Sequence, residues 1–303
     1  YGGVIDVFFR IKSLHERNVK VHLHCFEYGR QHSEYLENFC YSVNYYKRAT
    51  NISKLFNSLP YIVCSRDSKE LLDNLKKDNY PILLEGLHCC GILLDADIQK
   101  RNVIVRAHNV EHEYYDNLAK SEKNIKKKMY LKQEVLKLHN FESILNKASA
   151  ILAISQKDYN YFKSLYKNVY KLTAYNAYTE VNIIEGKGDY VLYHGNLEVS
   201  ENYAAAEYLV ETFKDTDINL KIAGMNPPQH LSQIIDYEDN IELIDSPDDK
   251  TLYDLIRNAQ INILVTAQST GLKLKLLNTL FNGRFCLVNE KMVEELDVNG
   301  LCY

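Results

Sequence analysis

The segment INILVTAQSTGLKLKLLNTLFNG, residues 261–283, carries the pattern from which we predict the fold. It opens with a short apolar run, over 261–265, that is typical of a buried β-strand. After Gly271 the apolar spacing changes to that of an amphipathic helix, which we expect to end at Gly283. A strand, a glycine-containing loop and a helix in this order are the building block of a parallel sheet.

The glycine loop of this segment also predicts an anion-binding site. Gly271 and the amides after it would form a helix N-terminus, where free N–H groups and the helix dipole favour negative charge. Lys273 and Lys275 add two positive charges within one turn, a combination that suits a diphosphate. Asn278, two turns into the helix, can hydrogen-bond to vicinal sugar hydroxyls. The alternative is an exposed helix start with ordinary surface lysines, and the Thr270-Gly271 pair at its entry favours the anion site.

Short apolar runs alternate with helical patterns along the whole chain. Because continuous apolar runs mark strands covered on both faces, this alternation predicts an α/β fold with doubly wound parallel sheets. The polar, glycine-containing stretch 185–189 indicates a linker, so we expect an N-terminal Rossmann-like domain over 1–184 and a C-terminal one over 185–303. The expected strands are 19–26, 61–64, 82–84, 103–105, 151–154, 169–173, 190–193, 220–223, 241–244, 261–265 and 285–288.

Composition narrows the class of protein. Hydrophobic residues make up 46% and charged residues 25%, and the net charge of −4 has the wrong sign for a protein that coats nucleic acid. No apolar run reaches roughly 18 residues, so we expect no membrane span. The seven cysteines form no C-x-x-C pair, which disfavours zinc-ribbon and thioredoxin-type sites and favours buried, reduced thiols in a cytoplasmic protein.

A lysine-rich helix is expected over 119–141. Between residues 119 and 139, seven lysines accompany two glutamates, a local charge of +5. Ile125, Met129 and Leu136 share one face, and the favoured interpretation is a core-facing apolar stripe beneath a solvated basic face. The alternative is that residues 120–137 dock on anionic lipid or on a polyanionic acceptor, as a peripheral contact at the inner membrane face.

Glycines follow two expected strands of the second domain. Gly195 and Asn196 come after the run 190–193, and Gly224 comes after 220–223. Open α/β sheets bind ligands beyond the carboxyl ends of their strands, so these loops are candidate ligand sites. Neither G-x-G-x-x-G nor the P-loop motif occurs, which disfavours a Rossmann dehydrogenase and a P-loop kinase.

Gly2 and Gly3 open a helical pattern over 2–18 at the very start of the chain. Such a pair lets backbone N–H groups approach an anion, although it is also common in tight turns. A strand should precede this helix in a βαβ unit, so we expect the first strand of the domain to be missing from the sequence.

Polar side chains also follow two expected strands of the first domain. They are Glu85 and His88 after the run 82–84, and Arg106, His108, Asn109 and Glu111 around the end of the run 103–105. A histidine at such a position can act as a general base, donate a hydrogen bond to phosphate, or be an ordinary loop residue. His108 and His112 with Glu111 between them also suggest a metal, but the spacing is not H-E-x-x-H, so we expect no zinc.

In their order and spacing, these motifs together resemble the retaining GT-B glycosyltransferases of group 1, family 4. The corresponding stretches are Gly2-Gly3, Arg106-Ala107-His108-Asn109-Val110-Glu111, residues 148–155, His194-Gly195-Asn196-Leu197, Ile222-Ala223-Gly224, and Thr270-Gly271-Leu272-Lys273-Leu274-Lys275-Leu276-Leu277-Asn278. The resemblance covers nearly the whole chain and implies two Rossmann-like domains that face a central cleft. It also implies terminal helices beyond Tyr303, so both termini are expected to be truncated.

The resemblance implies transfer of a sugar from a nucleotide-diphosphate sugar to a saccharide or lipid-linked acceptor in cell-surface polysaccharide synthesis. It implies retention of configuration, no metal or other cofactor, and no nucleic-acid partner. The implied catalytic residues are His108, Lys273 and Lys275, and the implied acceptor-side residues are Arg106, Asn109, Glu111, Glu85 and His88. The implied donor-binding residues are Gly2, Gly3, Gly195, Asn196, Gly224, Thr270, Gly271, Leu272 and Asn278.

Four positions depart from the family pattern. Asn196 and Glu201 stand where members commonly carry an Arg and a Lys, and Lys273 and Lys275 could supply that charge. Many members carry two glutamates separated by seven residues where this chain has Thr270 and Asn278. Asn278 can replace the ribose-binding glutamate, though more weakly, and the loss of the first glutamate leaves the sugar undefined. A catalytically silent GT-B module that binds nucleotide or a partner subunit therefore remains an alternative. A GT-B-fold epimerase is another, with Glu85 and Glu111 as its acid and base, whereas no pyridoxal-lysine motif supports a phosphorylase.

Overall fold

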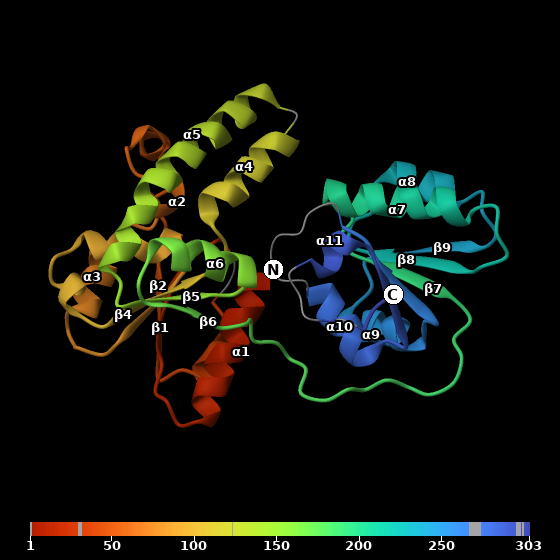
Figure 1. Ribbon diagram of the computed structural model, residues 1–303, viewed down its shortest axis with the longest axis horizontal. Helices are drawn as coiled ribbons and strands as arrows, with labels where there is room; N and C mark the ends of the chain where they lie inside the picture. Colours follow the sequence, from red (N-terminus) through yellow and green to blue (C-terminus); the bar gives the residue numbers. More distant parts are fainter. Residues whose placement is uncertain (1, 30–31, 123, 267–273, 295–297, 299) are drawn as a thin grey trace. The chain divides into compact units, whose positions relative to one another are not determined.

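The computed structural model describes all residues except 1, 30–31, 123, 267–273, 295–297 and 299. The chain forms two compact units, Gly3–Asn176 and Ala177–Tyr303, called unit 1 and unit 2 below (Figure 1). The sequence places the boundary between 184 and 185, whereas in the structure residues 177–184 pack with unit 2. Within this stretch the Asn182 amide donates to the Phe281 carbonyl at 2.7 Å, and the Tyr178 ring stacks on Phe281.

Unit 1 is built on parallel strands. A two-stranded sheet pairs β1 (His22–Phe26) with β2 (Ser42–Tyr46), and a four-stranded sheet has the order β3-β4-β5-β6. The strands of the second sheet are β3 (Ile82–Glu85), β4 (Val103–Ala107), β5 (Ala150–Ala153) and β6 (Val169–Lys171). The α-helices are α1 (Gly2–Glu16), α2 (Tyr61–Cys64), α3 (Lys69–Leu75), α4 (Glu111–Ser121), α5 (Ile125–Phe141) and α6 (Gln156–Leu165). The 3-10 helices are η1 (Glu34–Asn38), η2 (Ile52–Phe56), η3 (Leu87–Leu94), η4 (Ile98–Lys100) and η5 (Glu142–Lys147).

Unit 2 has one five-stranded parallel sheet with the order β11-β10-β7-β8-β9. Its strands are β7 (Val191–His194), β8 (Leu220–Gly224), β9 (Ile241–Asp245), β10 (Ile261–Leu264) and β11 (Phe285–Val288). Its helices are α7 (Ser200–Phe213), α8 (Gln229–Ile235), α9 (Asp249–Asn258), α10 (Leu274–Asn282) and α11 (Glu290–Val293). After β9 the chain crosses to the other side of β7, so the direction of winding reverses between β7 and β10. This is a doubly wound sheet, as the sequence predicts.

The expected strands form because their side chains are covered on both faces. In β4, for example, Val103, Val105 and Ala107 are buried on one face and Arg106 is buried on the other. The expected strand at 61–64 is wrong, since these residues form α2, which starts after Pro60, a residue whose fixed φ suits a helix start. The expectations also missed β2, because its alternating polar residues are only partly buried.

Residues 119–141 form two helices rather than the single expected one. α4 ends at Ser121 and α5 begins at Ile125. The break coincides with an N-cap, because the Asn124 side chain accepts a hydrogen bond from the Lys127 amide at 3.1 Å.

The expected orientation of the apolar stripe on this segment is also wrong. Ile125, Met129 and Leu136 are exposed, and the residues of α5 that face the core are Leu131, Leu138 and Phe141. α4 and α5 run side by side and extend away from the sheet (Figure 1). In the part of the chain that the structure describes, no helix has the length and apolar character needed to cross a bilayer.

Candidate active site

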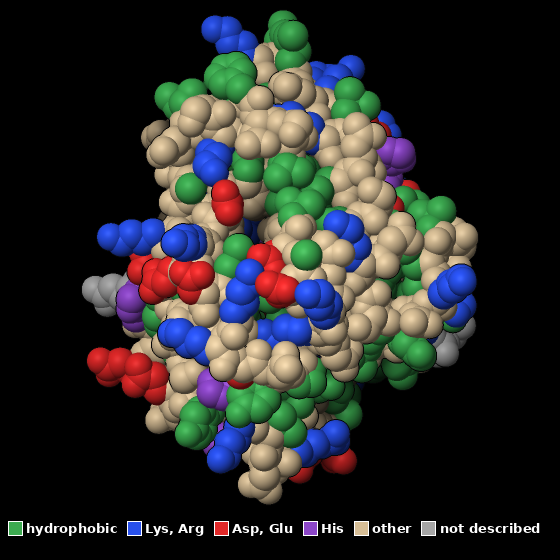
Figure 2. All heavy atoms as spheres, turned by 90° about the vertical axis from the view of Figure 1, so that its left-hand side faces the viewer, with side chains coloured by type: hydrophobic (Ala, Val, Ile, Leu, Met, Phe, Trp, Pro, Cys, Tyr) green, Lys and Arg blue, Asp and Glu red, His purple; other side chains and the backbone are tan. Residues whose placement is uncertain are grey.

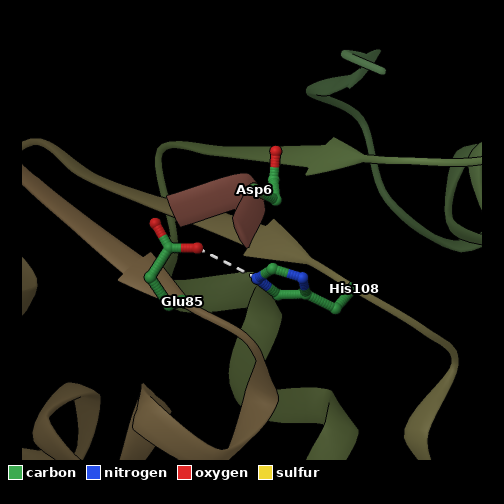
Figure 3. Close-up of side chains that lie close together, drawn as sticks. All are labelled: Asp6, Glu85 and His108. Atoms are coloured by element: carbon green, nitrogen blue, oxygen red, sulfur yellow. Dashed lines mark hydrogen bonds and ion pairs between the residues drawn. The ribbon is translucent and has the colours of Figure 1, made fainter. Parts of the chain in front are cut away.

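Glu85 and His108 lie together where two neighbouring strands of unit 1 end. β3 ends at Glu85, His108 directly follows β4, and the register pairs Glu85 with Arg106. The Nε2 atom of His108 is 2.9 Å from Oε2 of Glu85 (Figure 3). Both side chains keep some exposed surface, so a bound substrate can exchange a proton with the imidazole.

A buried ion pair ties the end of this sheet to α1. Arg106 has no exposed surface and donates to Oδ2 and Oδ1 of Asp6 at 2.7 and 3.0 Å. Its remaining N–H groups donate to the carbonyls of Leu172 and Thr173, each at 3.1 Å. The sequence places Arg106 on the acceptor side, but in the structure its guanidinium is enclosed and therefore positions other groups.

Arg10 extends this ion pair to the exposed end of the site. It lies one turn after Asp6 on α1, donates to Asp6 at 3.4 Å and also donates to Oε1 of Glu85. Glu85 therefore has one oxygen fixed by Arg10 while the other meets His108. Because the Glu85 carboxylate is held from α1, the orientation of the imidazole is set by residues that lie about a hundred positions earlier in the sequence.

Asp6, Glu85 and His108 also lie close enough to be considered as metal ligands, with ligand atoms within 4.8 Å of one another (Figure 3). The donor set does not fit a cation. Both oxygens of Asp6 already accept from Arg106, and Oδ1 also accepts from the Tyr175 amide at 2.7 Å. A metal ion would compete with two guanidinium groups for the same lone pairs, so the cluster fits a hydrogen-bonded charge network.

His88 and Glu111, two other predicted residues, are more enclosed. Burial, with a smaller contribution from the positive charge of Arg66, lowers the pKa of His88 to about 3, so its imidazole is neutral at pH 7. Burial raises the pKa of Glu111 to about 7, so both of its protonation states are populated at neutral pH. Asn109, between His108 and Glu111 in the chain, is half-buried.

A pair of arginines that the sequence analysis missed lies near these residues. The guanidinium carbons of Arg48 and Arg66 are 4.6 and 5.4 Å from the ring centre of Tyr28, and both charges lower the pKa of His88. Tyr28 and Arg48 line an open cavity of about 370 Å³ beyond the ends of β1 and β2. The Nε of Arg48 is buried and has no hydrogen-bond partner among the described residues. The missed strand β2 was the signal that would have placed Arg48 at a strand end.

In unit 2, the reversal between β7 and β10 places the carboxyl ends of these two strands next to each other. The two strands pair directly, with Ile261 opposite Val191, although β8 and β9 lie between them in the chain. The loop after β7 contains Gly195 and Asn196. The loop after β10 leads to Thr270, Gly271, Leu272 and Lys273, predicted site residues that lie outside the described part of the chain.

Gly224, the last residue of β8, packs against the β7 loop. A Cβ atom at Gly224 would lie 2.0 Å from the carbonyl oxygen of Gly195 and 2.8 Å from Cγ of Leu197. The amides of Gly195 and Leu197 donate to the carbonyls of Ala223 and Met225, each at 3.1 Å. Gly224 thus lets the loop backbone approach the end of the sheet closely.

Lys275, on α10, contacts the same loop region. Its Nζ donates to Oδ1 of Asn202 at 3.4 Å and to the Val265 carbonyl at 3.3 Å, and it lies 5.7 Å from the centre of the Tyr193 ring. These contacts hold a positive charge at the point where β7 and β10 end. A carboxylate lies at the same place, because the Thr266 hydroxyl donates to Oε1 of Glu201, so the donor-site role of Lys275 stays a prediction.

Three other predicted donor-binding residues, Gly2, Gly3 and Asn278, lie on helices. α1 begins at Gly2 and includes Gly3. Asn278 is turned along its own helix, because its Oδ1 accepts from Nδ2 of Asn282 at 2.8 Å.

His194 is a site residue that sequence reasoning left without a role. It ends β7, its Nε2 is buried without a hydrogen-bond partner among the described residues, and burial together with Lys275 lowers its pKa to about 4. The imidazole of His194 is therefore neutral at pH 7 and enclosed at the end of β7.

Comparison with known proteins supports this architecture. No protein-family model matches the chain. The chain is 28% identical over 310 residues to an uncharacterized 44.6 kDa protein in the cps region of Klebsiella pneumoniae, covering 94% of this chain and 78% of that protein.

Several solved structures share the fold at low identity. Anabaena HepE in complex with UDP and glucose has a TM-score of 0.60 and 11% identity, over 95% of this chain and 77% of HepE. Arabidopsis thaliana UGT89C1 complexed with UDP-L-rhamnose has a TM-score of 0.57 and 11% identity, over 99% and 80% of the two chains. A Polygonum tinctorium UDP-glucosyltransferase has a TM-score of 0.55 and 10% identity, over 96% and 78%. The predicted GT-B fold is confirmed, and the family 4 assignment stays a prediction.

Proposed function

We propose that this chain is a glycosyltransferase that takes its sugar from a nucleoside-diphosphate donor. The observation that carries the proposal is the switch point of unit 2, where the β7 loop, Gly224 and Lys275 lie together. Open α/β sheets bind their ligands at this point. The structures of similar fold include complexes with UDP and with UDP-L-rhamnose, which favours a uridine nucleotide.

The proposed role of Lys275 follows from the charge that the reaction creates. As the glycosidic bond lengthens, negative charge grows on the diphosphate oxygens of the donor. A cation held at the site before the reaction stabilises that charge more in the transition state than in the ground state, which accelerates the step. The predicted N-terminus at Gly271 and the side chain of Lys273 would act in the same way. We therefore propose a metal-independent transfer, and the resemblance to family 4 favours retention.

We assign His108 and Glu85 to the acceptor side of the reaction. The imidazole, oriented by Glu85, can hydrogen-bond to the acceptor hydroxyl or to a donor phosphate and can accept a proton. Arg10 and Asp6 act on the substrate only through Glu85, so they are positioning residues. Glu111, with its pKa of about 7, is close enough for His108 to lower that pKa, and it offers a second proton acceptor.

The acceptor that these residues favour is an anionic saccharide or a lipid-linked saccharide of cell-surface polysaccharide synthesis. The arginine pair at Tyr28 suits a phosphate or carboxylate group, and the buried Nε of Arg48 has no partner among the described residues. The relative in the cps region of Klebsiella pneumoniae supports the same setting.

The test of the donor site is calorimetric titration of the full chain with UDP, GDP, ADP and CDP in the absence of metal. We expect one nucleotide to bind at micromolar concentration, and we expect Lys275→Ala to weaken this binding about tenfold or more, the loss of one charge-assisted hydrogen bond. The matched control is Lys250→Ala, which removes an exposed lysine of α9 in the same unit.

A donor-hydrolysis assay then separates an enzyme from a silent module, because only the enzyme releases sugar from the bound donor. Absence of binding by all four nucleotides, or equal affinities for parent and Lys275→Ala, would overturn the proposed donor site. Binding without release of sugar would favour the silent module.

A further inference from the structure

We propose that α5 docks unit 1 on the surface of an anionic lipid bilayer. The starting observation is the exposed apolar stripe on this helix. Ile125, Met129 and Leu136 are 74%, 68% and 67% exposed. At about 100° per residue, the three side chains lie within about 40° of one another around the helix axis. They form a single line of large apolar groups directed to solvent, which an aqueous surface does not explain.

Lysines flank this stripe on both sides. With the same angular spacing, Lys128 and Lys132 lie on one side of the stripe and Lys126 lies on the other. No ion pair involves these three lysines within the described ranges, whereas Lys127 pairs with Glu122 at 2.6 Å. An apolar line with lysines on both sides is the arrangement of helices that lie in the interface of an anionic membrane.

The orientation of the stripe is fixed by the opposite face of the helix. Leu131 and Leu138 are buried against unit 1, and the buried Glu134 accepts from the Tyr61 amide at 2.6 Å. α5 also packs against α4 (Figure 1). The stripe cannot turn inward without breaking these contacts, so its exposure is a property of the folded unit.

A second exposed apolar element lies beside α5. In η2, Ile52 is 75% and Phe56 is 84% exposed, and η2 is tied to α5 by a hydrogen bond from Nζ of Lys137 to the Leu55 carbonyl at 2.9 Å. Figure 2 shows hydrophobic and basic side chains together at the top of the face it presents, where the α4–α5 pair lies. Phe56 is a side chain suited to the acyl boundary of a bilayer.

The charge pattern favours lipid over the other possible occupants. A second copy would bring two lysine-rich stripes together, and like charges across an interface disfavour association. A polyanionic chain would pair with the lysines but would leave the apolar line in contact with charged groups. An anionic bilayer suits both the lysines and the apolar line, because its headgroup phosphates pair with the lysines and its acyl chains contact the apolar side chains.

Vesicle sedimentation tests the proposal with the full chain and needs no nucleotide, so its outcome is independent of the proposed transferase activity. We expect binding to vesicles with phosphatidylglycerol and little binding to phosphatidylcholine alone. A lysine near an anionic surface contributes a factor of about five to partitioning, so Lys126, Lys128 and Lys132 all changed to Gln should weaken binding about a hundredfold. Changing Ile125, Met129 and Leu136 to Ser should reduce binding by at least as much.

Matched control variants change exposed residues of unit 2. The apolar control is Tyr208→Ser with Ile218→Ser and Tyr237→Ser, and the charge control is Lys187→Gln with Lys250→Gln and Lys291→Gln. Because all the altered side chains carry exposed surface, circular dichroism should show parent-like folding for every variant. Binding that depends on charge but is unchanged in the Ile125, Met129 and Leu136 variant would overturn the proposal. Absence of vesicle binding, with dimers in ultracentrifugation that this variant abolishes, would assign the stripe to a second copy.

Discussion

The ion pair between Asp6 and Arg106 gives the sharpest test of how unit 1 is held together. Asp6→Asn keeps the size of the side chain and removes its charge. Arg106 keeps its hydrogen bonds to the carbonyls of Leu172 and Thr173, but its charge is left in an environment with no exposed surface and no carboxylate of its own. Arg10 also loses one of its two partners.

The expected cost follows from the burial of both partners. Removing one partner of a buried ion pair costs about 3–5 kcal/mol, because the desolvation of the other charge is no longer offset. At about 1.4 kcal/mol per factor of ten, opening of the contact between α1 and β4 should become a hundredfold to several thousandfold more frequent. The effect is local to unit 1.

Hydrogen–deuterium exchange of the full chain measures this opening directly. Peptides from α1 and from residues 172–175 should exchange faster by that factor in Asp6→Asn, and peptides from unit 2 should be unchanged. Asp97→Asn is the matched control, because Asp97 pairs with Lys100 at the surface and such pairs contribute at most about 1 kcal/mol. The double variant Asp6→Leu with Arg106→Met removes both charges and should be far less affected than Asp6→Asn. If the amide exchange rates of α1 in Asp6→Asn stay within tenfold of those in the parent, the expected cost of removing the Asp6 charge is wrong.

Three further predictions concern the two sites. Glu111 has a folded pKa of about 7 against an ordinary value of 4.5, so the folded state binds more protons between these values and the parent loses stability as pH rises through them. Glu111→Gln removes this loss. In urea unfolding, the variant should be more stable than the parent by up to about 3 kcal/mol at pH 8 and little changed at pH 4.5. An equal difference in stability at both pH values would contradict the titration of Glu111 as the cause. Gly224→Ala places a methyl group against the Gly195 carbonyl, so it should destabilise unit 2 by about 1–3 kcal/mol and weaken nucleotide binding. Parent-like nucleotide affinity in calorimetry would mean that the β7 loop is not part of the donor site. His108→Ala should lower the rate of sugar transfer about a hundredfold while donor affinity stays close to that of the parent, and equal transfer rates would make His108 an ordinary loop residue.

The sequence predicts the strands of the four-stranded and five-stranded sheets well where both faces of a strand are buried. Runs such as 103–105 and 191–193 are apolar without interruption, and they form central strands covered on both faces. The tetrapeptide at 61–64 is equally apolar, but a run of this length is compatible with a helix or a strand, and Pro60 before it favours the helix. β2 shows the opposite case, because tertiary pairing with β1 makes a strand from residues with little apolar pattern.

The candidate site was predictable only where its residues follow strands. Glu85 and His108 were identified because the carboxyl ends of neighbouring parallel strands meet at one edge. Asp6 and Arg10 were not, since they lie inside an ordinary amphipathic helix and their partners are distant in sequence. On α5, spacing identified the line of Ile125, Met129 and Leu136 but not the side that it faces, because two apolar faces of different width are present on the same helix.

The buried charges of unit 1 indicate a functional rather than a stabilising origin. Burying Asp6, Arg106 and most of Arg10 requires the removal of their hydration, and apolar residues of similar volume would stabilise the same packing at least as well. What apolar residues cannot do is fix the carboxylate of Glu85. In the structure the chain of contacts from Arg106 to Asp6, Arg10 and Glu85 ends on the Nε2 of His108. The His108 side chain is partly exposed, so its other ring nitrogen can meet a substrate. If the network exists to orient that imidazole, the double variant Asp6→Leu with Arg106→Met should retain its fold and lose transfer at unchanged donor affinity. Transfer at the parent rate in that folded variant would assign the network to folding alone.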